Sequence, residues 1–306
     1  MKIVFMGTPD FAVPCLKALI NSEYEVSAVF TQPDKPKGRG YALCPPPVKE
    51  CALENSIEVY QPKSLKTGEA FEKIREINPD VIVVVAYGKI LPDNILEFPK
   101  YGCVNIHASL LPKYRGAAPI HWAVMNGETE SGVTAMQMDS GLDTGDILLS
   151  SAVPVGENET TGELHDKLAD MGAELIIKTL DGLENNAVTP QKQGETTTAY
   201  ASMLDRKICK IDWNQSALSV HNKIRGLSPF PAAVTTLNGK KVKLYLSALS
   251  DKSGSPGEIV SLSPLTVACK NGAVEILQLQ LEGKKRMSSK DFLLGHKLKL
   301  KDAFGN

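Results

Sequence analysis

An amide and an imidazole, two groups able to handle charge and protons, end a short apolar stretch at Asn105 and His107. Side chains two residues apart on a strand point to the same face. An amide N–H can stabilise a developing oxyanion, and an imidazole can exchange a proton near neutral pH. Asp143 follows on a glycine-punctuated loop, Gly141–Asp146, from which a carboxylate could hold the imidazole. Sequence spacing alone does not show that Asn105, His107 and Asp143 converge in space, and the alternative for such a histidine is a structural role.

The elements that would position these residues alternate along the first 180 residues. Apolar runs predict strands at Lys2–Met6, Glu25–Thr31, Val81–Ala86 and Cys103–His107. Helical stretches separate them: one with an apolar face (Phe11, Cys15, Leu19), then residues 46–54 and 67–77. A capping box, Thr160-Thr161-Gly162-Glu163, opens a long amphipathic helix. This alternation predicts an α/β domain with a Rossmann-like parallel sheet, whose ligands bind at the carboxyl ends of the strands.

The first turn of this fold, Gly7-Thr8-Pro9-Asp10, lacks the features of a nucleotide site. A dinucleotide fingerprint requires a second glycine where Pro9 stands, so that the backbone can approach a pyrophosphate. No phosphate-loop motif of the Walker type occurs elsewhere. The sequence therefore predicts the sheet without an NAD or ATP site at this turn.

The C-terminal third has a different pattern. From Glu184 to about Lys207 the chain is polar, rich in threonine and without periodicity, which predicts a linker. A helix is predicted at Ser216–Ile224, and then short alternating strands separated by turn signals at Ala233–Leu237, Lys241–Leu249, Glu258–Ser261, Leu265–Cys269 and Val274–Leu281. Five such strands favour a small OB-like β-barrel. We expect a first domain at 1–185, a linker at 186–207 and a second domain at 208–306.

Charge is distributed unevenly although the formal total is −1. Residues 205–306 hold 17 Lys and Arg against 8 Asp and Glu, whereas residues 1–204 hold 17 against 27. The basic third could meet a polyanion, and a lysine-rich surface kept for solubility is the alternative.

The six scattered cysteines form no CxxC pair, so neither a metal site nor a disulfide scaffold is expected. No membrane span or secretory signal is evident, and a cytoplasmic monomer is expected.

The stretch from Asn105 to Gly116, N-x-H-x-S-L-L-P-x-Y-R-G, and the later G-L-D-T-G resemble the folate-dependent formyltransferases and formyl hydrolases. In that family the asparagine, histidine and aspartate are catalytic, which maps onto Asn105, His107 and Asp143. The S-L-L-P segment borders the folate, and the end of the preceding strand lies along the pterin pocket. The resemblance thus implies folate contacts at Ser109, Leu110, Leu111, Pro112, Tyr87 and Gly88.

Resemblance to the tRNA-specific branch of this family covers nearly the whole chain. Residues 31–40 are similar to a loop that, in the branch, enters the acceptor stem with an essential arginine, and Arg39 occupies that place. The motif at residues 283–288 also matches. The resemblance implies tRNA contacts at Arg39, Lys35, Lys37, Lys284, Lys285 and Arg286. Two residues depart from the pattern: Phe230, where tryptophan is common, and Ala232, where glycine is common. A solvated surface loop is the alternative for both basic segments.

The resemblance implies transfer of a formyl group from 10-formyltetrahydrofolate to the amino group of methionyl-initiator-tRNA, without a metal and with tetrahydrofolate as the product. Two other functions stay open: formylation of a small-molecule amine by the same fold, and a non-catalytic RNA-binding protein on an enzyme scaffold. The basic C-terminal third and the Arg39 loop speak against the first, and the intact Asn105, His107 and Asp143 set speaks against the second.

Overall fold

The computed structural model describes residues 1–37 and 42–305. The chain forms two compact units, and each is discontinuous in sequence. Unit 1 comprises Met1–Gly116, Gly132–Val153 and His165–Tyr200, and unit 2 comprises Ala117–Ser131, Pro154–Leu164 and the residues from Ala201 onward. The expected boundaries at 185 and 207 stay a prediction.

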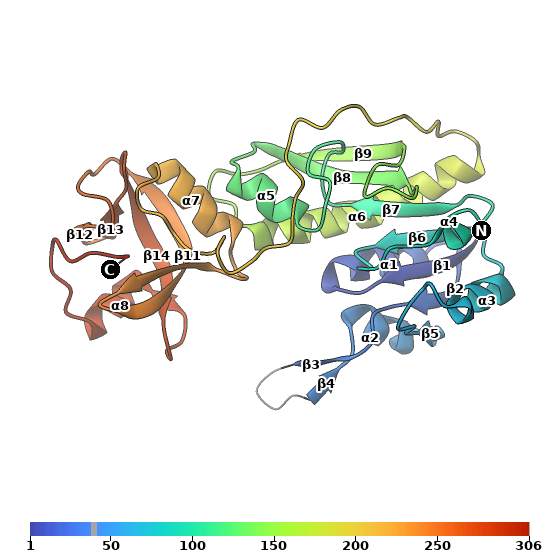
Figure 1. Cartoon of the computed structure of the whole chain (residues 1–306), viewed down its shortest axis with the longest axis horizontal. Coiled ribbons are helices and arrows are strands. Elements are labelled where there is room, and N and C mark those ends of the chain that lie inside the picture. Colours follow the sequence, from blue (N-terminus) through green and yellow to red (C-terminus); the bar gives the residue numbers. More distant parts are fainter. Residues whose placement is uncertain (38–41, 306) are drawn as a thin grey trace. The chain divides into compact units, whose positions relative to one another are not determined.

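Unit 1 is built on a seven-stranded sheet in the order β5-β2-β1-β6-β7-β8-β9 (Figure 1). Its strands are β1 (Lys2–Gly7), β2 (Glu25–Phe30), β5 (Val59–Tyr60), β6 (Val81–Val85), β7 (Cys103–His107), β8 (Glu130–Gln137) and β9 (Ile147–Pro154). A separate hairpin joins β3 (Lys35–Lys37) to β4 (Ala42–Cys44). The helices are η1 (Asp10–Ala12), α1 (Val13–Ile20), α2 (Pro47–Glu54), α3 (Gly68–Ile77), α4 (Asp93–Leu96) and most of α6 (Thr161–Glu184).

Helices cover both faces of this sheet, as the alternation predicted. Val4 and Ile82 belong to a buried apolar cluster with Ile74 of α3 and Ile95 of α4. On the other face α6 packs closely: a Cβ at Gly172 would lie 3.0 Å from Ile106 of β7 and 3.4 Å from Cys15 of α1. The predicted capping box is present, because the Thr160 backbone N–H donates to Glu163 at 2.8 Å.

The direction of one strand differs from the predicted all-parallel arrangement. β1, β2, β5, β6 and β7 run parallel, whereas β8 pairs with β7 antiparallel, His107 standing opposite Thr134. The sheet is therefore mixed. β8 has the sequence ESGVTAMQ, whose glycine and polar residues break a continuous apolar run, so neither periodicity nor composition predicted this strand.

Unit 2 contains a six-stranded antiparallel sheet in the order β10-β11-β14-β13-β12, with β15 paired to β14. The strands are β10 (Ala233–Leu237), β11 (Lys240–Ser250), β12 (Ile259–Leu262), β13 (Leu265–Ala268), β14 (Ala273–Leu281) and β15 (Met287–Ser288). The helices are α5 (Pro119–Met125), α7 (Ala217–Gly226) and α8 (Ser289–Gly295). All five strands predicted for this region are present.

A C-terminal segment links the two edge strands of this sheet. Phe304 bridges Leu237 at the end of β10, and Ala303 bridges Glu258 just before β12. Phe304 is 3% exposed and packs against Trp213 of the same core. The segment thus connects the two edges of the sheet, as a barrel-like fold requires.

Ala232, one of the two residues that depart from the family pattern, has φ 73°, a conformation that favours glycine.

Candidate active site

β7 presents Asn105 and His107 on one face at its carboxyl end. Both side chains are buried, with exposed fractions of 9% and 6%. Burial of an amide costs free energy unless it finds a partner. Among residues 1–37 and 42–305 nothing hydrogen-bonds to the Asn105 carboxamide, so its N–H groups are available to a bound molecule.

The two ring nitrogens of His107 face different groups. Nε2 lies 3.0 Å from the carbonyl oxygen of Tyr114, and Nδ1 lies 3.8 Å from Oδ1 of Asp143. A carbonyl only accepts hydrogen bonds, so Nε2 carries a hydrogen. The proton that His107 can gain or lose is therefore the one on Nδ1, on the side of the carboxylate.

Asp143 comes from the loop between β8 and β9, and the structure brings it to the end of β7. Its Oδ2 accepts a hydrogen bond of 2.9 Å from the Gly116 N–H, and its backbone has φ 55°. The 3.8 Å to His107 is an ion-pair distance rather than a hydrogen bond. Asp143 thus can stabilise a positive charge on His107 and orient the ring.

The loop after β7 is tied to β8 through one threonine. Thr134 Oγ1 donates to the Ser109 carbonyl at 2.7 Å and accepts from the Leu111 N–H at 3.1 Å. The Ser109 hydroxyl donates in turn to the Lys113 carbonyl at 2.6 Å. These bonds hold residues 109–113 in one conformation beside His107.

The residues expected to contact folate lie in different environments. Leu110 and Pro112 are partly exposed and Gly88 is exposed, whereas Ser109, Leu111 and Tyr87 are buried. The Tyr87 side chain packs in the apolar cluster under α3 and α4, where burial raises its pKa to about 12. Its hydroxyl has no partner among the described residues. Tyr87 therefore faces the core, and its carbonyl, which accepts from Thr8 and Gln32, faces the loops.

The described part of the basic loop predicted at residues 31–40 ends in β3, which pairs with β4. Lys35 lies in β3 opposite Cys44 and is exposed. Arg39 lies outside the described residues, as does the side chain of Lys37. The base of the hairpin is fixed: Lys49 forms a 2.8 Å ion pair with Asp34 and, with a hydrogen bond from Gln61, lowers the pKa of Asp34.

The basic triplet at residues 284–286 lies in unit 2, just before β15. Lys284 and Lys285 are exposed. The Arg286 guanidinium lies 4.2 Å from the ring centre of Tyr245 and donates to Gln278 at 2.7 Å. The two lysine side chains are thus exposed to an approaching anion, while Arg286 is held against β11 and β14.

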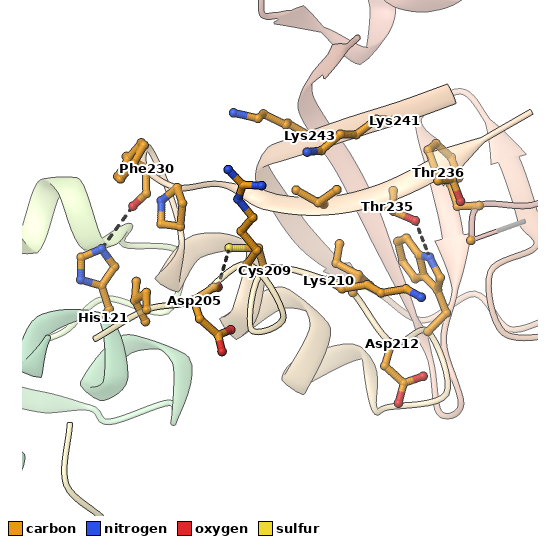
Figure 2. Close-up of a pocket in the computed structure, with 18 of the residues that line it drawn as sticks. His121, Asp205, Cys209, Lys210, Asp212, Phe230, Thr235, Thr236, Lys241 and Lys243 are labelled. Atoms are coloured by element: carbon orange, nitrogen blue, oxygen red, sulfur yellow. Dashed lines mark hydrogen bonds between the residues drawn. The ribbon is translucent and has the colours of Figure 1, made fainter. Parts of the chain in front are cut away.

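Unit 2 also contains a large hollow of about 1260 Å³ that sequence analysis did not single out. Lys241 and Lys243 come from β11 along one side of it, with Phe230 at one end (Figure 2). Its charged lining comprises four cations against two carboxylates: Arg206, Lys210, Lys241 and Lys243 with Asp205 and Asp212. Phe230 is 77% exposed, and its carbonyl lies 3.2 Å from Nε2 of His121. The sequence signal for this basic surface was the two-residue spacing of Lys241 and Lys243, which places both side chains on one face of a strand.

The described residues contain no group of three or more His, Cys, Asp or Glu side chains that could hold a metal ion. All six cysteines are free. Burial raises the pKa of Cys15, Cys103 and Cys269 to about 12, so these thiols stay protonated at neutral pH. Within the same residues, no helix is long and apolar enough to cross a membrane.

Comparison with protein families identifies two matching regions. Residues 1–180 match the formyl transferase family, and residues 203–297 match the formyl transferase C-terminal domain. Curated relatives match over almost their whole length. The chain is 51% identical to a methionyl-tRNA formyltransferase of Geobacter metallireducens, covering 97% of this chain and 96% of the relative. It is 50% identical to one of Clostridium novyi, covering 98% of each.

Solved structures of lower identity share the fold. An N-formyltransferase from Helicobacter canadensis, in complex with folinic acid and dTDP-3-aminofucose, is similar with a TM-score of 0.70 and 22% identity, covering 94% of this chain and all of that one. HypX from Aquifex aeolicus in complex with tetrahydrofolic acid has a TM-score of 0.64 and 18% identity, covering 98% of this chain and 50% of HypX. At these identities the similarity establishes the arrangement of elements.

Proposed function

The chain belongs to the formyl transferase family, among its methionyl-tRNA formyltransferases, and on that premise we propose that it formylates the amino group of methionyl-tRNA. The observation that carries the proposal is the His107–Asp143 pair beside an Asn105 carboxamide that has no partner within residues 1–37 and 42–305, in a chain half identical to those enzymes. We infer 10-formyltetrahydrofolate as the donor and initiator tRNA as the carrier of the methionine. Because charged initiator tRNA is used in translation, the proposal places the enzyme in the cytoplasm.

The chemistry required is an attack by the amine on the formyl carbon and departure of folate N10. A free α-amino group has a pKa of about 7.7–8.0, so part of it is already neutral at cellular pH. The demanding steps are stabilisation of the tetrahedral oxyanion and protonation of the departing nitrogen. No covalent intermediate with the protein is needed.

The proposed roles follow from the geometry of the site. The Asn105 carboxamide donates to the oxyanion, since no other residue in the described part of the chain accepts from its N–H groups. His107 moves a proton through Nδ1, because Nε2–H is held by the Tyr114 carbonyl. Asp143, 3.8 Å from Nδ1, stabilises the protonated ring and orients it. Leu110, Pro112 and Gly88 are the accessible members of the set proposed to contact folate.

Two regions are proposed to bind the tRNA. The first comprises Lys35 and Lys37 of the β3–β4 hairpin, whose base is anchored by the Asp34–Lys49 pair, together with Arg39, which lies outside the described residues. The second is the basic surface of unit 2, comprising Lys284, Lys285 and the hollow. The lysines of this surface attract the tRNA phosphates electrostatically, and an exposed aromatic ring such as that of Phe230 can stack on a base.

The test is to supply 10-formyltetrahydrofolate with either methionyl-initiator-tRNA or an amino-sugar nucleotide and to measure formylated product by mass spectrometry. We expect formylmethionyl-tRNA to form, and the His107→Ala variant to form it far more slowly. Formylation of the amino sugar instead would favour the small-molecule alternative. Tight tRNA binding without turnover would favour a non-catalytic RNA-binding protein.

A further inference from the structure

The polar segment after α6, predicted as a linker, is attached to the active-site loops. Gln191 pairs with Ile147 at the start of β9, through backbone hydrogen bonds of 2.7 and 2.8 Å in the two directions. This pairing carries the following residues past the loop that bears Asp143. All of the residues concerned belong to unit 1.

Two residues farther along, the Gln193 carboxamide joins the two loops that form the site. Its Nε2 donates to the carbonyl oxygens of Asp143 and Gly145, at 3.0 and 2.6 Å. Its Oε1 accepts from Nε and Nη2 of Arg115, at 2.9 and 2.7 Å. A carboxamide has two N–H donors and an oxygen with two lone pairs, so Gln193 uses its full capacity here.

Gln193 holds a residue whose backbone adopts a sparsely populated conformation. Asp143 has φ 55°, a left-handed conformation that persists in a non-glycine residue only when its surroundings maintain it. Gln193 binds the carbonyl of Asp143, and the Gly116 N–H binds its carboxylate. Without the first bond the loop can relax and move the carboxylate away from Nδ1 of His107.

The same segment also contacts the partner of the other ring nitrogen. Thr198 Oγ1 accepts a 2.7 Å hydrogen bond from the Tyr114 N–H, and the Tyr114 carbonyl faces Nε2 of His107. Gln193 and Thr198 therefore fix the groups on both sides of the imidazole.

We propose that Gln193 is a positioning residue for formyl transfer, holding Asp143 at the His107 ring through the Asp143 backbone. The inference rests on the catalytic roles in the proposed function. It assigns to the segment between the predicted domains a direct part in organising the site.

The test compares Gln193→Met, which removes all four contacts at similar volume, with Gln193→Glu, which keeps the acceptor for Arg115 and loses both donors. Both variants should lower kcat about tenfold or more and change KM for either substrate less than about twofold, because the contacts orient a catalytic group. Gln191→Met is the matched control: its side chain is exposed and has no hydrogen bond among the described residues. We expect its kcat to equal that of the parent.

A double-mutant cycle separates positioning from general loss of structure. If Gln193 acts through Asp143, Gln193→Met should change kcat less than about twofold in an Asp143→Asn background. An equal fall of kcat in both backgrounds, or full kcat in Gln193→Glu, would overturn the inference. If Gln193→Met does not fold, as judged by thermal unfolding, the Gln193→Glu cycle decides. An Asp143→Asn enzyme with parental kcat would instead contradict the proposed function.

Discussion

At the scale of single residues, the chemistry of the site depends on which side-chain atoms already form hydrogen bonds within the protein. His107 uses Nε2 for the Tyr114 carbonyl and keeps Nδ1 for the exchangeable proton. Asn105 is 9% exposed, and its carboxamide has no hydrogen-bond partner among the described residues, which leaves its N–H groups for a bound molecule. The difference between the two explains why we assign proton transfer to one and charge stabilisation to the other.

The assignment of Asn105 leads to the first prediction. Asn105→Ala should lower kcat about 10²–10³-fold, the usual effect of removing one oxyanion donor, with little change in folate affinity. Single-turnover formylation at saturating folate measures this rate. Asn185→Ala, a change of the same kind at an exposed position just after α6, should have no effect. A fall of only a few-fold for Asn105→Ala would mean that the oxyanion is stabilised by another group.

Sequence predicted some of these residues and missed others for definable reasons. The two-residue spacing predicts from the sequence alone that Asn105 and His107 lie on one face of a strand, because strand geometry fixes it. Gln193 could not be found in this way. It lies in a threonine-rich stretch without periodicity, and its importance comes from long-range hydrogen bonds to Asp143 and Arg115.

At the scale of elements, α7 is joined to two other parts of unit 2 by one buried histidine. His221 Nδ1 lies 2.9 Å from the Ser247 hydroxyl on β11, and Nε2 lies 3.0 Å from the Glu157 carbonyl. The carbonyl requires hydrogen on Nε2, so Nδ1 accepts from the serine. Both nitrogens are satisfied in the neutral ring, and burial lowers the pKa of His221.

This arrangement predicts a pH dependence of stability. The unfolded chain gains a proton on His221 near pH ~6.5, whereas the folded chain resists it, so the unfolded state binds more protons below that pH. The contribution of His221 to the free energy of unfolding should therefore fall as the pH falls from about 7.5 to 5.5. Thermal unfolding across this range should show a shallower fall in His221→Gln than in the parent. His296→Gln is the control, and a slope unchanged in His221→Gln would contradict the prediction.

Elements with strong periodicity were predictable, and those shaped by their neighbours were not. β7 was predicted from Cys103 to His107 as observed, and α2 and α3 within a residue or so of their ends. β8, an antiparallel strand within an otherwise parallel region, gave no signal, because its stability comes from pairing with β7 rather than from its own sequence. Its Thr134 nevertheless fixes the loop that carries Ser109.

At the scale of the whole molecule, the two lysine pairs in the surface of unit 2 proposed for tRNA make distinguishable predictions. Lys241→Glu with Lys243→Glu should weaken tRNA binding and reduce the slope of log Kd against log salt by about 2, since each phosphate contact contributes about 0.9. Binding titrations between low and moderate salt measure the slope. Lys252→Glu with Lys270→Glu, two exposed lysines of the same unit, is the control. If instead only Lys284→Glu with Lys285→Glu flattens the slope, the hollow is not the binding face.

The division of the chain also bears on how the site is held. Gly116, whose N–H binds the Asp143 carboxylate, is the last residue of its stretch of unit 1, and the next residue already belongs to unit 2. Ala117 and Ala118 donate to the Ala201 carbonyl, and the α5 helix that follows packs with α7. A single peptide link therefore separates the anchor of the acidic group from the basic unit. A displacement of the Gly116–Ala117 peptide would therefore act on the Asp143 carboxylate through the Gly116 hydrogen bond.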